Sequence, residues 1–202
     1  PEDQELLTKI INLLDETGCK ESDLYFNVAA KLFEMNPSTS AAYELATLSK
    51  KQGEFEQAQD YYLKAINLSE DNEQKSRYYL ELSQMIYREN KDLPQAREYA
   101  KKAVDANSDN AKAYMMLGNI YASVKGFGEN EVQEKAVFWL AVDYYQQAKQ
   151  VDPSIADEAN SQIQTYRKYF PAKENIFFYG YDEGDSFKLG GWINETTTVR
   201  IP

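Results

Sequence analysis

The sequence has no histidine and a single cysteine, Cys19, among its 202 residues. Zinc sites of cysteine and histidine are therefore excluded, and so are the Ser/His and Cys/His pairs that activate a nucleophile. Carboxylates are abundant, but they fall mostly on polar helix faces, which disfavours a paired-carboxylate hydrolase. We expect a protein that is not an enzyme and that holds no metal or cofactor. A lone cysteine cannot form an intrachain disulfide, so the redox compartment stays open.

Basic residues are also scarce, since 22 lysines and arginines stand against 33 acidic residues and leave a net charge of −11. Binding to a phosphate backbone requires clustered basic side chains, so we expect no nucleic-acid partner. The same charge disfavours docking on an anionic membrane surface. The longest apolar run, Ala136 to Val142, is far shorter than a membrane span. A protein or a peptide is the partner class that these absences leave.

Glycine and proline are sparse, with 9 and 6 residues, and apolar residues recur at helical spacing between them. The clearest example is 40–72, where Gly53 separates two short amphipathic helices. Ala46 and Ala58 are small where two helix backbones must approach closely, and Leu45 and Tyr62 fill the space beside them. A hairpin this small cannot bury its apolar face alone, so it needs copies of itself on either side.

Copies of this helix pair recur along the chain. Leu82 follows Leu45 by 37 residues, and Leu117 follows Leu82 by 35. The turn of the last pair is swollen by about eleven residues, Ser123 to Lys135. We predict a helical repeat domain over 1–170, with pairs over about 3–37, 40–72, 76–110 and 111–153 and a capping helix over 154–169 that begins with a capping box of Ser154 and Asp157.

The segment 171–202 has a different character, because it is rich in aromatic and β-branched residues. We predict a small β-like extension in which 176–181 pairs with 186–193, and Thr196 to Ile201 forms a possible third strand. A free hairpin is marginal in water, so it must lean on the repeats, on another copy or on a further domain.

Three short motifs carry less weight. Gly126-Phe127-Gly128 lacks the preceding strand and the third glycine of a phosphate loop, so a flexible insertion is favoured. The acidic stretch from Asp182 to Asp185 is favoured as a turn over a calcium site, because it lacks the twelve-residue ligand spacing. Asn194-Glu195-Thr196 has the pattern of a glycosylation sequon, which is common by chance.

The second to fourth pairs resemble tetratricopeptide repeats, a 34-residue unit with large and small residues at fixed positions. In the fourth pair the matching residues are Tyr114, Leu117, Gly118, Tyr121, Ala141, Tyr145, Ala148 and Pro153. The resemblance covers roughly residues 3–153, and it implies an all-α fold, a right-handed superhelix of helix pairs. The aromatic tail resembles tails of exported bacterial repeat proteins, which implies a periplasmic or cell-envelope location. Because the chain opens at Pro1 without methionine, we expect a processed or truncated piece.

The resemblance also implies a concave groove lined by the first helix of each pair, where ligands lie. The groove candidates by register are Tyr43, Thr47, Lys50, Lys51, Arg77, Leu80, Gln84, Tyr87, Arg88, Lys112, Met115 and Asn119. Because this set has five basic residues and no acid, we expect a partner that is acidic. Lys112 and Asn119 suggest the family's chaperone-tail clamp, but Glu81 replaces an asparagine that the clamp needs, so we do not predict that ligand.

These observations favour a non-catalytic scaffold that binds a protein or peptide in the groove. The alternative is association with a partner or a second copy through the aromatic tail, with the repeats as a spacer. The tail-contact candidates are Phe177, Phe178, Tyr179 and Trp192. The partner's identity and the oligomeric state stay open.

Overall fold

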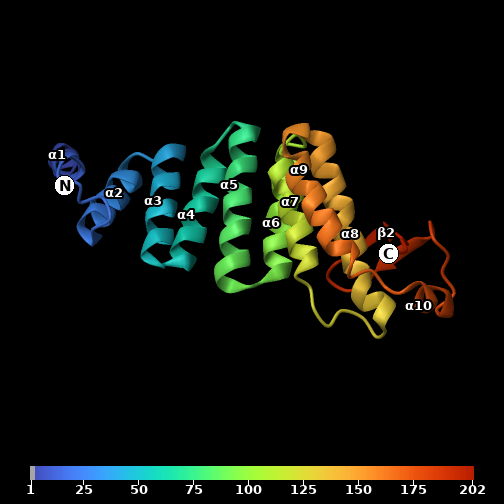
Figure 1. The fold of residues 1–202 in the computed structure, drawn as a ribbon. Helices are drawn as coiled ribbons and strands as arrows, with labels where there is room; N and C mark the ends of the chain where they lie inside the picture. The colour runs from blue at the N-terminus through green and yellow to red at the C-terminus, as the bar shows by residue number, and fades with distance from the viewer. Residues whose placement is uncertain (1–2) are drawn as a thin grey trace.

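The computed structural model describes residues 3–202, which form a row of antiparallel helices that ends in a small sheet (Figure 1). The helices of the row are α1 (Gln4–Glu16), α2 (Asp23–Met35), α3 (Thr39–Gln52), α4 (Phe55–Leu68), α5 (Asn72–Met85), α6 (Leu93–Ala106), α7 (Ala111–Ala122), α8 (Glu131–Val151) and α9 (Ala156–Arg167). The short helix α10 (Lys173–Phe178) and the strands β1 (Ser186–Leu189) and β2 (Glu195–Thr198) follow. The all-α superhelix with a small β extension is confirmed.

Local signals explain where most of these helices begin. An oxygen of the preceding side chain accepts a hydrogen bond from a backbone N–H of the first turn, which satisfies a donor that the helix itself leaves free. The capping side chains are Ser22, Ser38, Asp71, Asp92, Asn110 and Asn130. Gly53 ends α3 with φ of +83°, a backbone conformation that favours glycine. The predicted break at this position is therefore confirmed.

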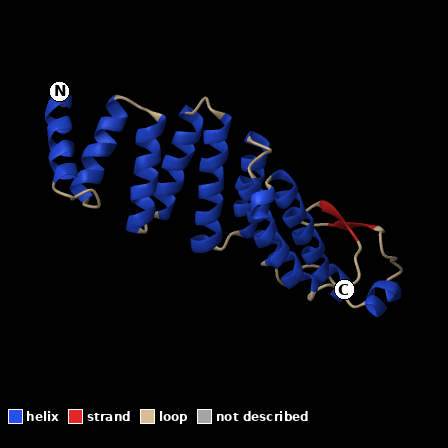
Figure 2. Cartoon of the chain, turned by 45° about the horizontal axis from the view of Figure 1, so that its top comes forward, coloured by secondary structure: helices blue, strands red, loops and turns tan. Residues whose placement is uncertain are grey.

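Each predicted pair packs as an antiparallel hairpin, and neighbouring hairpins stack (Figure 2). Ala46 and Ala58 are completely buried where α3 and α4 meet, beside the buried Leu45 and Tyr62. The same small residues recur in the later pairs, so the helices approach closely along the whole row. This stacking buries a large apolar cluster that extends from Ala46 into the β extension, and a smaller cluster around Phe33, Leu45 and Tyr78.

Two helices differ from the prediction in length. Residues Ile86–Asn90 form a π-helical turn after α5, and Lys91 then has φ of +55°. This wider turn lies between Leu82 and Leu117, which are 35 residues apart, one more than the 34-residue unit. A π-helical turn accommodates an extra residue at the end of the helix. The helix α8 begins at Glu131, so the swollen turn is 123–130 and the predicted bound at Lys135 is wrong. Asn130 caps the longer helix, and Val132 is buried in the core, which explains its early start.

The predicted capping box of Ser154 and Asp157 is absent. The Asp152 carboxylate accepts the Ser154 N–H at 2.9 Å, and a short 3-10 turn, Pro153–Ile155, leads into α9. Ile155 directly precedes α9, and among the residues that the structure describes its side chain makes no capping hydrogen bond to the helix. The helix is held by packing instead, because the Tyr166 ring stacks on Tyr145 at 5.9 Å.

The extension also differs from the prediction, because 176–178 belong to α10 and do not form a strand. The aromatic run has high β propensity, but only Ile176 of this helix is buried and no neighbouring strand is available to it. The observed ladder pairs β1 with β2 antiparallel, from Ser186 opposite Thr198 to Leu189 opposite Glu195. The predicted strand over 186–193 therefore pairs with the predicted third strand.

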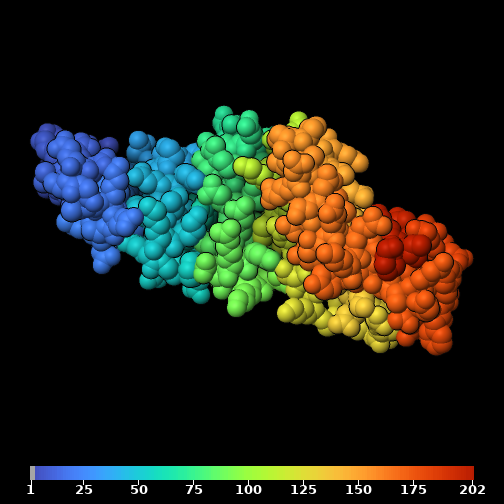
Figure 3. Space-filling view, viewed as in Figure 1, coloured from blue at the N-terminus to red at the C-terminus, as the bar shows by residue number. Residues whose placement is uncertain are grey.

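The extension leans on its own repeats, where it continues the surface of the last helices (Figure 3). Phe187 packs edge-on against Trp139 of α8 at 5.6 Å between ring centroids. The Trp139 indole N–H donates to the Arg200 carbonyl oxygen at 2.9 Å. Leu189 and Val199 are buried in the same core as the repeats. The hairpin therefore obtains from α8 the packing that it lacks alone.

Candidate functional site

The helices α3, α5 and α7 are the first helices of the second, third and fourth pairs. The groove candidates lie on them, except Tyr87 and Arg88, which lie in the π-helical turn after α5. We call the helices' shared surface the first-helix face. Two bonds join successive helices across it: Tyr43 of α3 bonds to Glu81 of α5, and Tyr87 bonds to Ser123 at 2.6 Å. The face is therefore a continuous surface formed by residues far apart in the sequence.

A polar network lies where α3 and α4 meet α5. The Tyr43 hydroxyl donates to both Glu81 oxygens, at 2.9 and 3.1 Å, and the Tyr62 hydroxyl donates to Glu81 at 3.1 Å. Lys50 Nζ donates to the Tyr62 hydroxyl at 3.2 Å. Burial and the Glu81 carboxylate raise the pKa of both tyrosines, so both phenols stay protonated as donors. Glu81 thus places a half-buried carboxylate next to the candidate Tyr43, although Glu81 is not itself one of the candidates.

Two other candidates of α3 already have partners. Lys51 Nζ pairs with the Glu21 carboxylate at 3.1 Å, and the Thr47 hydroxyl donates to the Tyr43 carbonyl oxygen at 3.0 Å. Both residues line a hollow of about 410 Å³ between α3 and the turn after α1. The α3 end of the face therefore offers a polar surface whose basic groups are engaged.

A second hollow, of about 340 Å³, lies between α5 and α7. Its lining residues are Glu73, Arg77, Leu80, Asn107, Asp109, Asn110, Ala111, Lys112 and Asp152. The Arg77 guanidinium lies over the Tyr78 ring at 5.3 Å, and Lys112 is exposed at the start of α7. Within residues 3–202, Arg77, Arg88 and Lys112 have no ion pair. This end of the face therefore has free cations beside three carboxylates.

The remaining groove candidates are less accessible. Met115 is buried in the core, and Gln84 is half-buried. The Asn119 side-chain oxygen accepts a hydrogen bond from the Tyr145 hydroxyl at 2.8 Å, and Tyr87 is tied to Ser123. Gln84 lies on α5, Met115 and Asn119 lie on α7, and Tyr87 lies in the π-helical turn after α5. The side chains of Met115, Asn119 and Tyr87 already contact their own fold.

The tail candidates separate into two groups. Phe177, Phe178 and Tyr179 are exposed, with Phe178 80% accessible. Trp192 is half-buried in the turn between β1 and β2, with the Arg97 guanidinium 6.0 Å from its ring. Three adjacent aromatics are therefore exposed to solvent, whereas Trp192 packs between the extension and Arg97 of α6.

Sequence reasoning missed one buried polar centre, around Glu195. Its carboxylate accepts hydrogen bonds from Arg97 at 2.5 Å, Lys101 at 2.7 Å, and the Tyr121 and Tyr144 hydroxyls at 2.5 Å each. These partners come from α6, α7 and α8, so one residue of β2 fastens the extension to three helices. No local pattern marks Glu195, because every partner lies at least 51 residues away in the sequence.

Among residues 3–202, no helix combines the length and apolar character that a membrane crossing requires. Residues 38–109 match the model of the tetratricopeptide repeat family. The photosystem I assembly protein Ycf3 of Cyanophora paradoxa is 26% identical over 158 residues, which cover 76% of this chain and 90% of that protein.

Solved structures show the same fold. The crystal structure of MamA aligns with a TM-score of 0.57 and 20% identity, over 78% of this chain and 82% of that one. YrrB, described as a TPR protein with an unusual peptide-binding site, aligns with a TM-score of 0.55 and 19% identity, over 86% of this chain and 79% of that one. Residues 38–109 therefore match tetratricopeptide repeats, and the stacked pairs with their buried small residues share the fold of these solved structures.

Proposed function

We propose that the first-helix face binds a peptide or an extended segment of a partner protein. The observation that carries this proposal is the hollow between α5 and α7, where Arg77 and Lys112 have no ion pair and Leu80 supplies an apolar wall. A carboxylate of the partner would gain charge-assisted hydrogen bonds there, while Glu73, Asp109 and Asp152 limit how acidic the segment can be. The peptide-binding site described for YrrB and the assembly role in the name of the Ycf3 relative support this use of the fold.

A charge-reversal experiment tests the proposal. A photo-activatable residue at Lys112 captures the partner in the native host, and its affinity is then measured for wild type and for the variant Arg77→Glu/Arg88→Glu/Lys112→Glu. We expect the variant to fold normally and to bind at least about tenfold more weakly, because three attractive contacts become repulsive. The matched control, Lys125→Glu/Arg167→Glu/Lys168→Glu, changes exposed residues outside the face by the same charge and should bind as wild type. Equal affinity of both triple variants would refute the groove assignment.

A second candidate function rests on the three exposed aromatics of the tail. Phe177, Phe178 and Tyr179 expose between 44% and 80% of their surface, although α10 buries Ile176. Apolar side chains exposed together often mark an interaction surface. Replacing Phe177 and Phe178 with serine should weaken capture of the partner if the tail carries the contact. Unchanged capture would remove this candidate and leave the first-helix face.

A further inference from the structure

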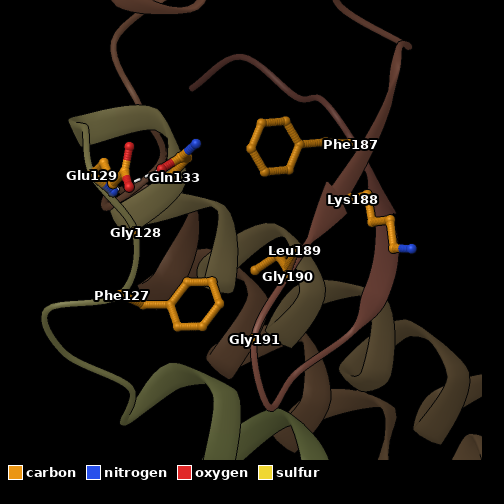
Figure 4. Close-up of a pocket in the computed structure, with 9 residues that line it drawn as sticks. All are labelled: Phe127, Gly128, Glu129, Gln133, Phe187, Lys188, Leu189, Gly190 and Gly191. Atoms are coloured by element: carbon orange, nitrogen blue, oxygen red, sulfur yellow. Dashed lines mark hydrogen bonds between the residues drawn. The ribbon is translucent and has the colours of Figure 1, made fainter.

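The extension leaves one backbone edge free beside a hollow of about 390 Å³ (Figure 4). One wall consists of five consecutive residues, Phe187 to Gly191, which belong to β1 and to the turn that follows it. The opposite wall consists of Phe127, Gly128, Glu129 and Gln133. Side chains alternate between the two faces of a strand, so a wall of consecutive residues is formed by the strand's edge. The sheet has the order β1–β2, so this edge of β1 has no neighbouring strand.

The backbone groups on this edge can be assigned from the ladder. The Val199 N–H donates to the Asp185 carbonyl oxygen at 2.8 Å, in register with the pairs of β1 and β2. Bonded and non-bonded pairs alternate in an antiparallel ladder, so Phe187 and Leu189 bond to β2. The N–H and C=O groups of Ser186 and Lys188 therefore point away from β2, and both residues are exposed.

We propose that an extended segment of another protein adds to β1 as a third strand and fills this hollow. Main-chain hydrogen bonds to Ser186 and Lys188 would supply affinity, and alternate side chains would supply specificity. Side chains on the inner face of the segment lie beside Phe127 and Phe187, which favours apolar residues. Side chains on the outer face lie beside Lys188, which favours Asp or Glu.

Charge separates this occupant from a second copy of the chain. If two β1 edges paired antiparallel about Lys188, the two lysines would lie directly opposite each other, which destabilises a ladder. In the described part of the chain, Lys188 has no ion pair of its own. A segment with an acidic residue at the facing position would pair with it. The edge is therefore suited to a different chain that carries a carboxylate.

A displayed library of random peptides tests the site on the full-length protein. Selection is made on wild type, and peptides that also bind Lys188→Pro are removed. Proline deletes the outward N–H but no bond to β2, so the hairpin should persist. We expect survivors in which apolar residues alternate with Asp or Glu and whose affinity for Lys188→Pro is about tenfold lower or worse. The control Lys188→Thr keeps the N–H and should lower affinity only about 1.4- to 5-fold.

A second measurement does not depend on the folding of a variant. One surviving peptide is N-methylated at single positions, and binding should be lost at every second position, where the peptide N–H faces β1. In wild-type protein the amide signals of Ser186 and Lys188 should shift and become protected from exchange. The triple variant of Arg77, Arg88 and Lys112 should bind the peptide as wild type, since its face is separate. No surviving peptide, equal effects of all N-methyl positions, or amide changes elsewhere would overturn the proposal.

Discussion

At the scale of single residues, Glu195 determines how the extension is attached. Its side chain is 15% exposed and lies against Arg97, Lys101 and two tyrosine hydroxyls. Burial alone would raise the pKa of Glu195, but hydrogen bonds from Lys101, Tyr121, Tyr144 and Arg97 outweigh it and lower the pKa to about 2. The carboxylate is therefore charged in the folded protein at all ordinary pH values.

This pKa predicts a pH dependence of stability. The folded-state pKa of Glu195 lies below its ordinary value of 4.5, so its contribution is fully present above about pH 4.5 and is lost as the pH falls towards 2. The variant Glu195→Gln should melt at a lower temperature at pH 7 and show a smaller difference from wild type near pH 2. Thermal melts at both pH values check this, and a difference that does not shrink in acid would contradict it.

Gly118 of α7 lies directly against the Tyr145 ring of α8. A Cβ atom added there would lie 2.4 Å from the Tyr145 ring, whose side chain is completely buried. Gly118→Ala should therefore destabilise the fold by about 1–3 kcal/mol through overpacking, despite the better helix propensity of alanine.

Urea denaturation measures the cost of that substitution. The control Gly190→Ala adds a methyl group where no atom lies within 4 Å, and it should be nearly neutral. Equal effects of the two substitutions would show that close packing at Gly118 is not the cause.

At the scale of elements, the helix pairs were predictable because their signals are local. These signals are the capping side chains, Gly53, and the spacing of Leu45, Leu82 and Leu117. Each lies within one turn or about one repeat of the helix position that it determines. The π-helical turn, the early start of α8 and the helix α10 were not predictable. The helix α10 depends on the burial of Ile176, and the early start of α8 depends on the burial of Val132 as well as on the Asn130 cap.

The same distinction applies to the candidate site. Register alone placed Arg77 and Lys112 on first helices and Arg88 at the end of one, and the structure leaves all three without an ion pair within residues 3–202. It could not show that Glu81 bonds to Tyr43 across 38 positions, or that Met115 turns into the core. Which side chains are free depends on the tertiary contacts.

Close packing within a pair predicts that the fold loses stability both when a large buried residue is made smaller and when a small one is made larger. Leu45→Ala and Leu117→Ala should each cost about 2–5 kcal/mol, because they leave a cavity at a buried position. Ala58→Leu and Ala141→Leu should each cost about 1–3 kcal/mol, because both alanines are completely buried between helices. Urea denaturation checks all four, and unchanged midpoints would count against the packing described.

At the scale of the whole molecule, the two ends of the array differ. At the C-terminal end α9 and the extension cover α8, and Trp139 is completely buried. At the other end α1 has no buried residue, and Leu6 and Leu13 are more than half exposed. The described repeats are therefore closed by their own chain at one end only.

Removal of residues 172–202 should consequently damage the repeats. The deletion exposes Trp139 and leaves Arg97 and Lys101 without the Glu195 carboxylate. We expect a lower melting temperature and aggregation, since an uncovered apolar core surface promotes association. The control Phe178→Ser changes an exposed residue of the same segment and should melt as wild type. A truncated protein that melts like wild type would contradict the shared core.

Hydrogen–deuterium exchange of the complex with the cross-linked partner tests the scaffold function most directly. Binding on the first-helix face predicts slower exchange in α3, α5 and α7, strongest near Arg77 and Lys112 at the hollow between α5 and α7. Protection confined to α4 and α6, or only to β1 and α10, would contradict that account.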